Sequence, residues 1–577
     1  MLQSQSRHAG LDRIFARSWY AGAGRTADEL DRPLVAIANS WNEIAPENIH
    51  LRSVADAVKA GVRAAGGTPM EFGSIHTTDV IAMASEGMRY VLPSRELVAD
   101  CVEAMISAHA FDAVVLIAGG DKVTPGMVMG ALRTGVPAVY VYAGTTEVGW
   151  YRGRAVSWET VFEAIGQRRR GVIDDADVEG LVAAQMPGPG GGASAYTGNS
   201  MAMAAEALGL AVPHSSTAVA GSSEQLRLAW QAGAGCVHAL ETGRGIRDVV
   251  TEAGIRNAAR VAISVSGSTN VPLHLAAIAH EAGVRFGFDE FDPLCQKTPT
   301  LVHLRPSGAV SLPEFHRAGG VPTVLRELGD LIEDAPAALA PSTREIARAA
   351  PDADGVIVHT RAEPVAESGG LVVLRGSLAP RGALVKAAGV APESHRIAGP
   401  ARVYECEEDA CVAIYGGSVS PRDVVVIRNE GPRGGPGFRE MLGATAAIVG
   451  MGLESTVALV TDGRFSGASH GAVIGYISPE AASGGPIGLV QDGDRIEIDI
   501  AAATLELCVA DDELRTREGR GLAQLPSGGG LLTRYAMLVS EACDGAVLST
   551  RTTQTISRSE TRRQALRASN ESTDASR

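Results

Sequence analysis

Short apolar runs alternate with longer amphipathic segments through the first 350 residues of the chain. Residues 34–38 (LVAIA) and 113–117 (AVVLI) are continuous apolar runs, which is typical of strands buried on both faces. Residues 49–65 and 95–108 carry apolar side chains at helical spacing. Strands that alternate with helices predict a parallel sheet covered by helices on both sides. We therefore predict an N-terminal α/β domain over residues 1–350.

The pattern changes near residue 355, after a segment rich in Ala and Pro at 336–350. Beyond it, short strand-like runs recur between glycine-containing turns, at 356–358, 371–374, 424–427, 458–460, 495–500 and 504–507. This spacing predicts a β-rich, barrel-like domain over residues 355–548. Residues 549–577 are Ser, Thr, Arg and Glu with almost nothing apolar, so we expect a disordered tail.

Length, charge and cysteine content indicate a multidomain protein and argue against several classes of partner. A chain of 577 residues is too long for one hydrophobic core and predicts two or more domains. Its formal net charge of -15 argues against a surface for nucleic acid or anionic membranes. The sequence has no apolar signal region and no membrane-length apolar window. The seven cysteines fit no disulfide framework or zinc motif, so we interpret them as reduced thiols of a cytoplasmic protein.

Candidate chemistry follows the strand predicted at 113–117, where Gly119 and Gly120 precede Asp121 and Lys122. Ligands of open α/β sheets bind at the carboxyl ends of the strands. Asp121 is an oxygen donor suited to a divalent metal, and Lys122 could pair with a substrate carboxylate or, if carbamylated, supply a second oxygen ligand. Taken alone, an Asp-Lys pair is more often a surface salt bridge in a βα turn.

Other segments occur in a particular order along the chain: NSWNEI at 39–44, LPSREL at 92–97, GSTN at 267–270, EGPRGGPG at 430–437 and TDGRFSG at 461–467. Together with the Asp-Lys pair they resemble the dihydroxy-acid dehydratase and sugar-acid dehydratase family, from about Arg17 to about Gly545. The resemblance implies a carbon–oxygen lyase, a hydro-lyase, that acts on a small hydroxylated carboxylic acid. It also implies a homodimer or homotetramer.

The sequence departs from this family where three cysteines hold an iron–sulfur cluster. Glu47, Gly120 and Gly192 stand at the three cysteine positions. Thiolates hold such clusters, and neither glycine nor glutamate offers one. We therefore expect no iron–sulfur cluster in this protein.

The metal ligands of the family are retained. The resemblance places metal-binding groups at Asp79, Asp121, Lys122 in carbamylated form, and Glu430. An oxygen-only set of this kind suits Mg²⁺. Each of these residues alone is more often a solvated charge, but all four fall on the positions of the family.

The resemblance also implies catalytic and substrate-binding residues. Ser466 matches the serine that removes the C2 proton, and Ser194 and Arg464 are the expected substrate-binding residues. Without the cluster, the 3-hydroxyl loses its Lewis acid, which forfeits several kcal/mol of barrier lowering. Glu47, with its pKa raised in a dry pocket, could act as general acid instead, or it could simply fill an emptied cavity. His76 is a further candidate because it is unusual for its motif.

Two readings remain open. In the first, the chain is a cluster-free, Mg²⁺-dependent hydro-lyase acting on a 2,3-dihydroxy or related acid, with a role in specialised metabolism. Proton exchange or epimerisation without loss of water would also suit the retained residues. In the second, the chain is a non-catalytic pseudo-enzyme subunit that binds ligand or pairs with a relative that carries the cluster.

Overall fold

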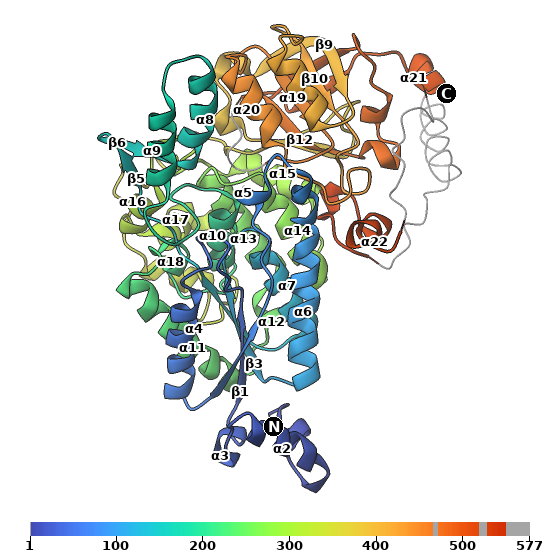
Figure 1. The fold of residues 1–577 in the computed structure, drawn as a ribbon. Coiled ribbons are helices and arrows are strands. Elements are labelled where there is room, and N and C mark those ends of the chain that lie inside the picture. Colours follow the sequence, from blue (N-terminus) through green and yellow to red (C-terminus); the bar gives the residue numbers. More distant parts are fainter. Residues whose placement is uncertain (1, 466–470, 518–527, 550–577) are drawn as a thin grey trace, which may run out of the picture.

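The computed structural model describes residues 2–465, 471–517 and 528–549, which form two parts, one above the other in Figure 1. The lower part is built on a four-stranded sheet in the order β2-β1-β3-β4, with every neighbouring pair parallel. Its strands are β1 (Leu34–Asn39), β2 (Thr68–Gly73), β3 (Ala113–Ala118) and β4 (Ala138–Tyr142). The apolar runs of β1 and β3 lie at the centre of the sheet and are fully buried, as their sequence predicts.

Helices cover both faces of this sheet (Figure 1). On one side α4 (Leu51–Ala64) packs against α11 (Ser223–Glu241), and on the other α6 (Pro93–His109) packs against α7 (Val123–Thr134). The pair α4 and α11 lies very close, because a Cβ on Gly61 would stand 2.0 Å from the Trp230 carbonyl oxygen. The other helices of eight or more residues before residue 350 are α2 (Ile14–Gly22), α8 (Trp158–Arg169), α9 (Asp175–Gln185), α10 (Thr197–Ala207), α13 (Glu252–Ser264), α14 (Asn270–Ala282), α15 (Phe288–Lys297) and α17 (Gly320–Leu328).

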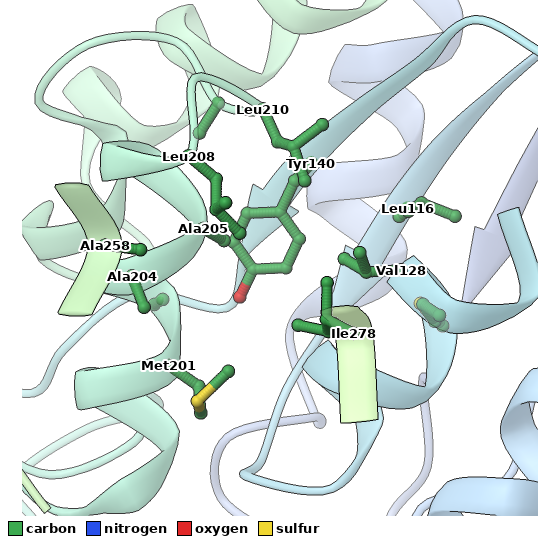
Figure 2. Packing of buried hydrophobic residues seen from close by; sticks show 14 of the residues in the cluster. Leu116, Val128, Tyr140, Met201, Ala204, Ala205, Leu208, Leu210, Ala258 and Ile278 are labelled. Carbon is green, nitrogen blue, oxygen red and sulfur yellow. The ribbon is translucent and has the colours of Figure 1, made fainter. Parts of the chain in front are cut away.

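The core between the sheet and α10 is shown in Figure 2. The Tyr140 ring of β4 is buried there, and its hydroxyl group lies 2.9 Å from Thr124 Oγ1 of α7. Small side chains such as Ala204 and Ala205 let α10 approach the ring closely (Figure 2). This packing fixes β4, α7 and α10 relative to one another, and both helices begin at the carboxyl edge of the sheet.

The upper part contains an eight-stranded sheet in the order β14-β13-β9-β10-β11-β12-β8-β7. The strands β9 to β12 run parallel and the others antiparallel. A bridge between Arg375 and Thr504 joins the two edges, so the sheet is nearly closed. The strands are β7 (Val372–Leu374), β8 (Gly382–Val385), β9 (Arg396–Tyr404), β10 (Val424–Ile427), β11 (Ala458–Thr461), β12 (Val473–Ser478), β13 (Arg495–Asp499) and β14 (Thr504–Leu507).

The predicted fold class, a parallel-sheet α/β part followed by a β-rich barrel-like part, is confirmed. The helices of the second part are α19 (Glu407–Tyr415), α20 (Leu442–Gly450), α21 (Asp511–Arg517) and α22 (Leu531–Leu538). The strand expected at 356–358 is wrong, because three backbone N–H groups there donate to the Asp354 carboxylate instead of to a ladder. Residues 550–577 of the expected tail lie outside the described residues.

No helix in the described ranges is long and apolar enough to cross a membrane.

The end of the described chain returns to the first part, where it meets the buried Arg95 of α6. The Arg95 guanidinium donates to the carbonyl oxygens of Gly545 at 3.0 Å and Ala546 at 2.7 Å, and it also donates to Glu96 Oε1 at 2.8 Å. One buried arginine thus connects α6 to residues hundreds of positions later in the chain.

Replacing Arg95 with alanine should strongly destabilise the protein. The change leaves the buried Glu96 carboxylate and two buried carbonyls without their main donor, which costs about 3 kcal/mol or more. Urea unfolding of R95A, compared with the exposed-site control R13A, measures the loss. Equal unfolding midpoints for the two variants would contradict this account of the connection.

Candidate functional site

A pocket of ≈ 360 Å³ lies between the carboxyl edge of the lower sheet and the upper part. Residues after β1 (Pro46, Glu47) and after β3 (Gly120, Asp121) form its floor, together with the glycine-rich stretch at 190–192. The short helix α5 (Asp79–Ala82) forms one wall, and Glu440 reaches in from the upper part. The pocket therefore stands where ligands of open α/β sheets bind.

Three carboxyl groups meet in this pocket, those of Asp79, Asp121 and Glu440. One oxygen of each lies within 4.8 Å of the others. Within the described residues, Asp121 Oδ1 and Glu440 Oε2 are buried and have no hydrogen-bond partner. Burial and the neighbouring Asp121 carboxylate raise the pKa of Asp79 well above its usual value. Like charges with unsatisfied oxygens are the donor set that a divalent cation such as Mg²⁺ requires.

Two cations hold Glu440 in place. Its Oε1 atom accepts from Lys122 Nζ at 3.2 Å, from Asn270 Nδ2 at 2.8 Å, and from Arg464 Nη1. Burial alone would raise the pKa of Glu440, but the Arg464 guanidinium and the Lys122 ammonium hold it at about 2. Lys122 Nζ also pairs with Asp121 Oδ2, so one lysine links carboxylates from the two parts of the chain.

The structure places Glu430 differently from the sequence-based expectation. Its carboxylate pairs with Arg439 Nη2 at 2.5 Å and with Arg89 Nη1 at 3.4 Å, and it is not one of the three converging carboxylates. Glu440, farther along the same loop, stands beside Asp79 and Asp121 instead. Sequence reasoning missed Glu440, and its only signal was an acidic side chain at the end of the glycine-rich loop, just before α20.

Two further predicted residues do not line this pocket in the part of the chain that the structure describes. Arg464 lies behind Glu440, where its Nε donates to the Phe438 carbonyl at 2.6 Å. Ser194 is buried in the loop before α10. Ser466 lies outside the described residues. The roles of these three residues in substrate binding and proton removal stay predictions.

The three positions where the resembled family has cysteine, Glu47, Gly120 and Gly192, all line the pocket. A Cβ on Gly120 would stand 2.2 Å from His76 Nε2, because the imidazole fills that space. A Cβ on Gly192 would touch the Tyr196 ring at 3.4 Å. Among the residues that the structure describes, no cysteine lines the pocket. This wall offers no thiolate, so an iron–sulfur cluster does not fit it.

Glu47 lines this wall of the pocket, and His76 lies behind it, next to the Glu47 carboxyl group. His76 Nε2 lies 3.7 Å from Glu47 Oε1, and the exposed fractions of the two side chains are 1% and 13%. Burial lowers the pKa of His76 to about 4 and raises the pKa of Glu47 to about 7. The imidazole is thus neutral near pH 7, where the Glu47 carboxyl group is able both to hold and to release a proton.

A methyl group at residue 120 should compete with the His76 ring for space. Gly120 has a φ of +87°, so G120A combines left-handed backbone strain with a clash, and we expect a loss of about 2 kcal/mol or more. Removing the ring in H76A/G120A should relieve the clash but not the strain. A double-mutant cycle of unfolding free energies should therefore show a coupling of about 1 kcal/mol or more, whereas additive effects would contradict the packing.

The raised pKa of Glu47 should make stability depend on pH. The folded state binds this proton more tightly than the unfolded state between the ordinary value of 4.5 and about 7. The stabilisation is complete below the lower value and is lost as pH rises through the higher one. E47Q lacks this dependence, so its stability relative to the wild type should rise by up to roughly 3 kcal/mol from about pH 5 to about pH 8. Urea unfolding in EDTA at several pH values checks this, and parallel pH profiles would contradict it.

Comparisons with known proteins show the family of the chain. The family model "Dihydroxy-acid/6-phosphogluconate dehydratase N-terminal" matches residues 32–345, and its C-terminal counterpart matches residues 356–546. The chain is 45% identical to a dihydroxy-acid dehydratase of Moorella thermoacetica, over 95% of this chain and 100% of that protein. It is 46% identical to one of Nitratidesulfovibrio vulgaris strain DP4 (94% and 100%) and 44% identical to one of Pyrococcus abyssi (93% and 98%). The chain belongs to the dihydroxy-acid/6-phosphogluconate dehydratase family.

Proposed function

We propose that the chain is a hydro-lyase that removes water from a 2,3-dihydroxy or related hydroxylated carboxylic acid, uses Mg²⁺, and works without an iron–sulfur cluster. The relatives are named dihydroxy-acid dehydratases, which supports the reaction and the class of substrate. The single observation that carries the metal site is the meeting of three carboxylates, two with unpartnered buried oxygens, in one pocket. The lack of thiolates at three positions supports the cluster-free form.

Asp79, Asp121 and Glu440 would hold the ion. A carbamate on Lys122 would add a further oxygen, since Nζ lies 3.2 Å from Glu440 Oε1. Bound Mg²⁺ would supply a Lewis acid for the negative charge that develops when the C2 proton is removed. Arg464 holds Glu440 in its ionised form and fixes its orientation, and Lys122 does the same as long as it is not carbamylated.

The elimination needs two proton transfers, and a residue of the protein carries out each one. Ser466 is the proposed base that takes the proton from C2, and the C2–H electron pair forms the new C2=C3 bond. Glu47, whose carboxyl group lines the pocket, is the proposed acid. Its proton goes to the 3-oxygen as the C3–O bond breaks, so water leaves and the enol product becomes a 2-keto acid.

A second candidate is an enzyme that forms the enolate but does not expel water. The replacement of all three cysteine positions favours this candidate, because the hydroxyl group is a poor leaving group without a strong acid. A non-catalytic subunit is the third possibility. Proton NMR in D₂O with Mg²⁺ and a panel of dihydroxy and sugar acids separates them. Formation of a 2-keto acid supports the hydro-lyase, deuterium at C2 alone supports the enolising enzyme, and no change supports the subunit.

Three broader expectations are also proposals. The resemblance and the two separate sheets support domains at 1–350 and 355–548. Family analogy supports a homodimer or homotetramer, which light scattering on the purified protein would test. The reduced cysteines support a cytoplasmic location.

Variants of two glutamates from the same loop test the metal site. E440Q should lose at least about a hundredfold in the rate of C2 deuterium exchange, because it removes a proposed Mg²⁺ ligand. E430Q should lose less than about tenfold, because Glu430 pairs with Arg439 and Arg89 and is not one of the three converging carboxylates. Exchange should also vanish in EDTA and return with Mg²⁺. Equal losses in the two variants, or exchange that survives EDTA, would overturn the proposed ligand set.

A further inference from the structure

His76 occupies the space that a side chain at residue 120 would need. It comes from the loop between β2 and α5, and its ring meets the position of a Cβ on Gly120 through three atoms, at 2.2, 2.8 and 2.9 Å. The side chain is 1% exposed and does not itself line the pocket. The ring is therefore a buried support behind the pocket wall, at the place where the resembled family has a thiolate.

Glu47 is the acidic residue that lies next to the His76 ring. It lies in the loop after β1 and lines the pocket, whereas His76 lies behind it. Across the described part of the chain, His76 is the one basic side chain within salt-bridge distance of the Glu47 carboxylate, at 3.7 Å. The arginine and lysine contacts of this region go to Asp121, Glu430 and Glu440 instead. The imidazole thus stands beside the Glu47 carboxyl group, close enough to limit its orientation.

We propose that His76 is a positioning residue that fixes the Glu47 carboxyl group toward the leaving 3-hydroxyl, so that the His76–Glu47 pair takes over the space and the task of the missing cluster. This inference rests on the proposed function, in which water is lost. The step balances without a redox partner: the carboxyl proton goes to the departing oxygen, and that oxygen keeps the electron pair of the C3–O bond. His76 does not touch the substrate and acts only through Glu47.

The geometry also distinguishes this role from simple filling of space. A side chain that only fills a cavity can be replaced by an apolar one of similar size with little effect on the reaction. A side chain that holds an acid in place must keep a polar atom where Nε2 stands, because general acids contribute about 10²- to 10⁴-fold only when they are correctly placed. Leucine and glutamine at residue 76 separate the two cases: both fill space, and only glutamine offers a polar group near the position of Nε2.

The test measures two rates on the full-length protein with Mg²⁺: deuterium entry at C2, and 2-keto acid formation. In H76L, keto acid formation should fall about a hundredfold or more while C2 exchange and KM change less than about threefold. H76Q should recover at least a tenth of the wild-type rate. E47Q should resemble H76L. The control H50L removes another imidazole, one that bonds the Ala143 carbonyl at 2.7 Å, and should leave the ratio of the two rates unchanged.

Each outcome of this test supports or overturns the proposed role of His76. An unchanged ratio in H76L overturns the inference, as does a wild type that exchanges C2 but never loses water. A wild type that does neither overturns the proposed function itself, and the positioning role with it. If H76L does not fold, G120A serves as a second variant, because its methyl group displaces the ring without altering either residue of the pair. An exchange-to-elimination ratio in G120A equal to that of the wild type would then count against the proposal.

Discussion

The convergence of Asp79, Asp121 and Glu440 is the constraint on which this structure depends. Three carboxylates with an oxygen each within 4.8 Å repel one another, and burial strengthens the repulsion. The protein offsets part of this charge with Lys122 and Arg464, which both bind Glu440 Oε1. One oxygen of Asp121 and one of Glu440 still lack partners within the described residues. Such an arrangement is stable only if the surrounding structure holds it or a cation completes it.

Much of the surrounding structure holds these three carboxylates in place. Arg89 and Arg439 bracket Glu430, and so connect the segment after α5 to the loop that carries Glu440. A second connection runs through Tyr476, whose hydroxyl group donates to Asn270 Oδ1 at 2.8 Å, and Asn270 in turn donates to Glu440. The two parts of the chain are therefore joined by hydrogen bonds to the site itself. Glu430, although it is not one of the converging carboxylates, thus belongs to the connections between the two parts.

The sequence predicted those features that arise from local pattern. The buried strands β1 and β3 are continuous apolar runs, and a pocket lies at their carboxyl ends, where the sequence predicted the chemistry. Strand β9 was missed because Gly399 and Pro400 interrupt its pattern, and both residues usually weaken a strand. Glu440 was missed for a different reason: its contact with Lys122 spans 318 positions, and no local pattern encodes such a distance. Ser466 was predicted from its motif alone, and it lies outside the described residues.

The three positions where the resembled family has cysteine lie in a packed wall of the pocket. Cavities in packed interiors are costly. Here the Gly120 position is filled by the His76 ring, whose bulk requires that residue 120 have no side chain. The Glu47 carboxyl group lines the pocket, and the imidazole lies 3.7 Å from it. The His76 ring in its present position requires glycine at residue 120, and a cysteine there would collide with it. A buried ring that requires glycine at residue 120, beside a carboxyl group that lines the pocket, is the kind of packing that a positioned acid at Glu47 needs.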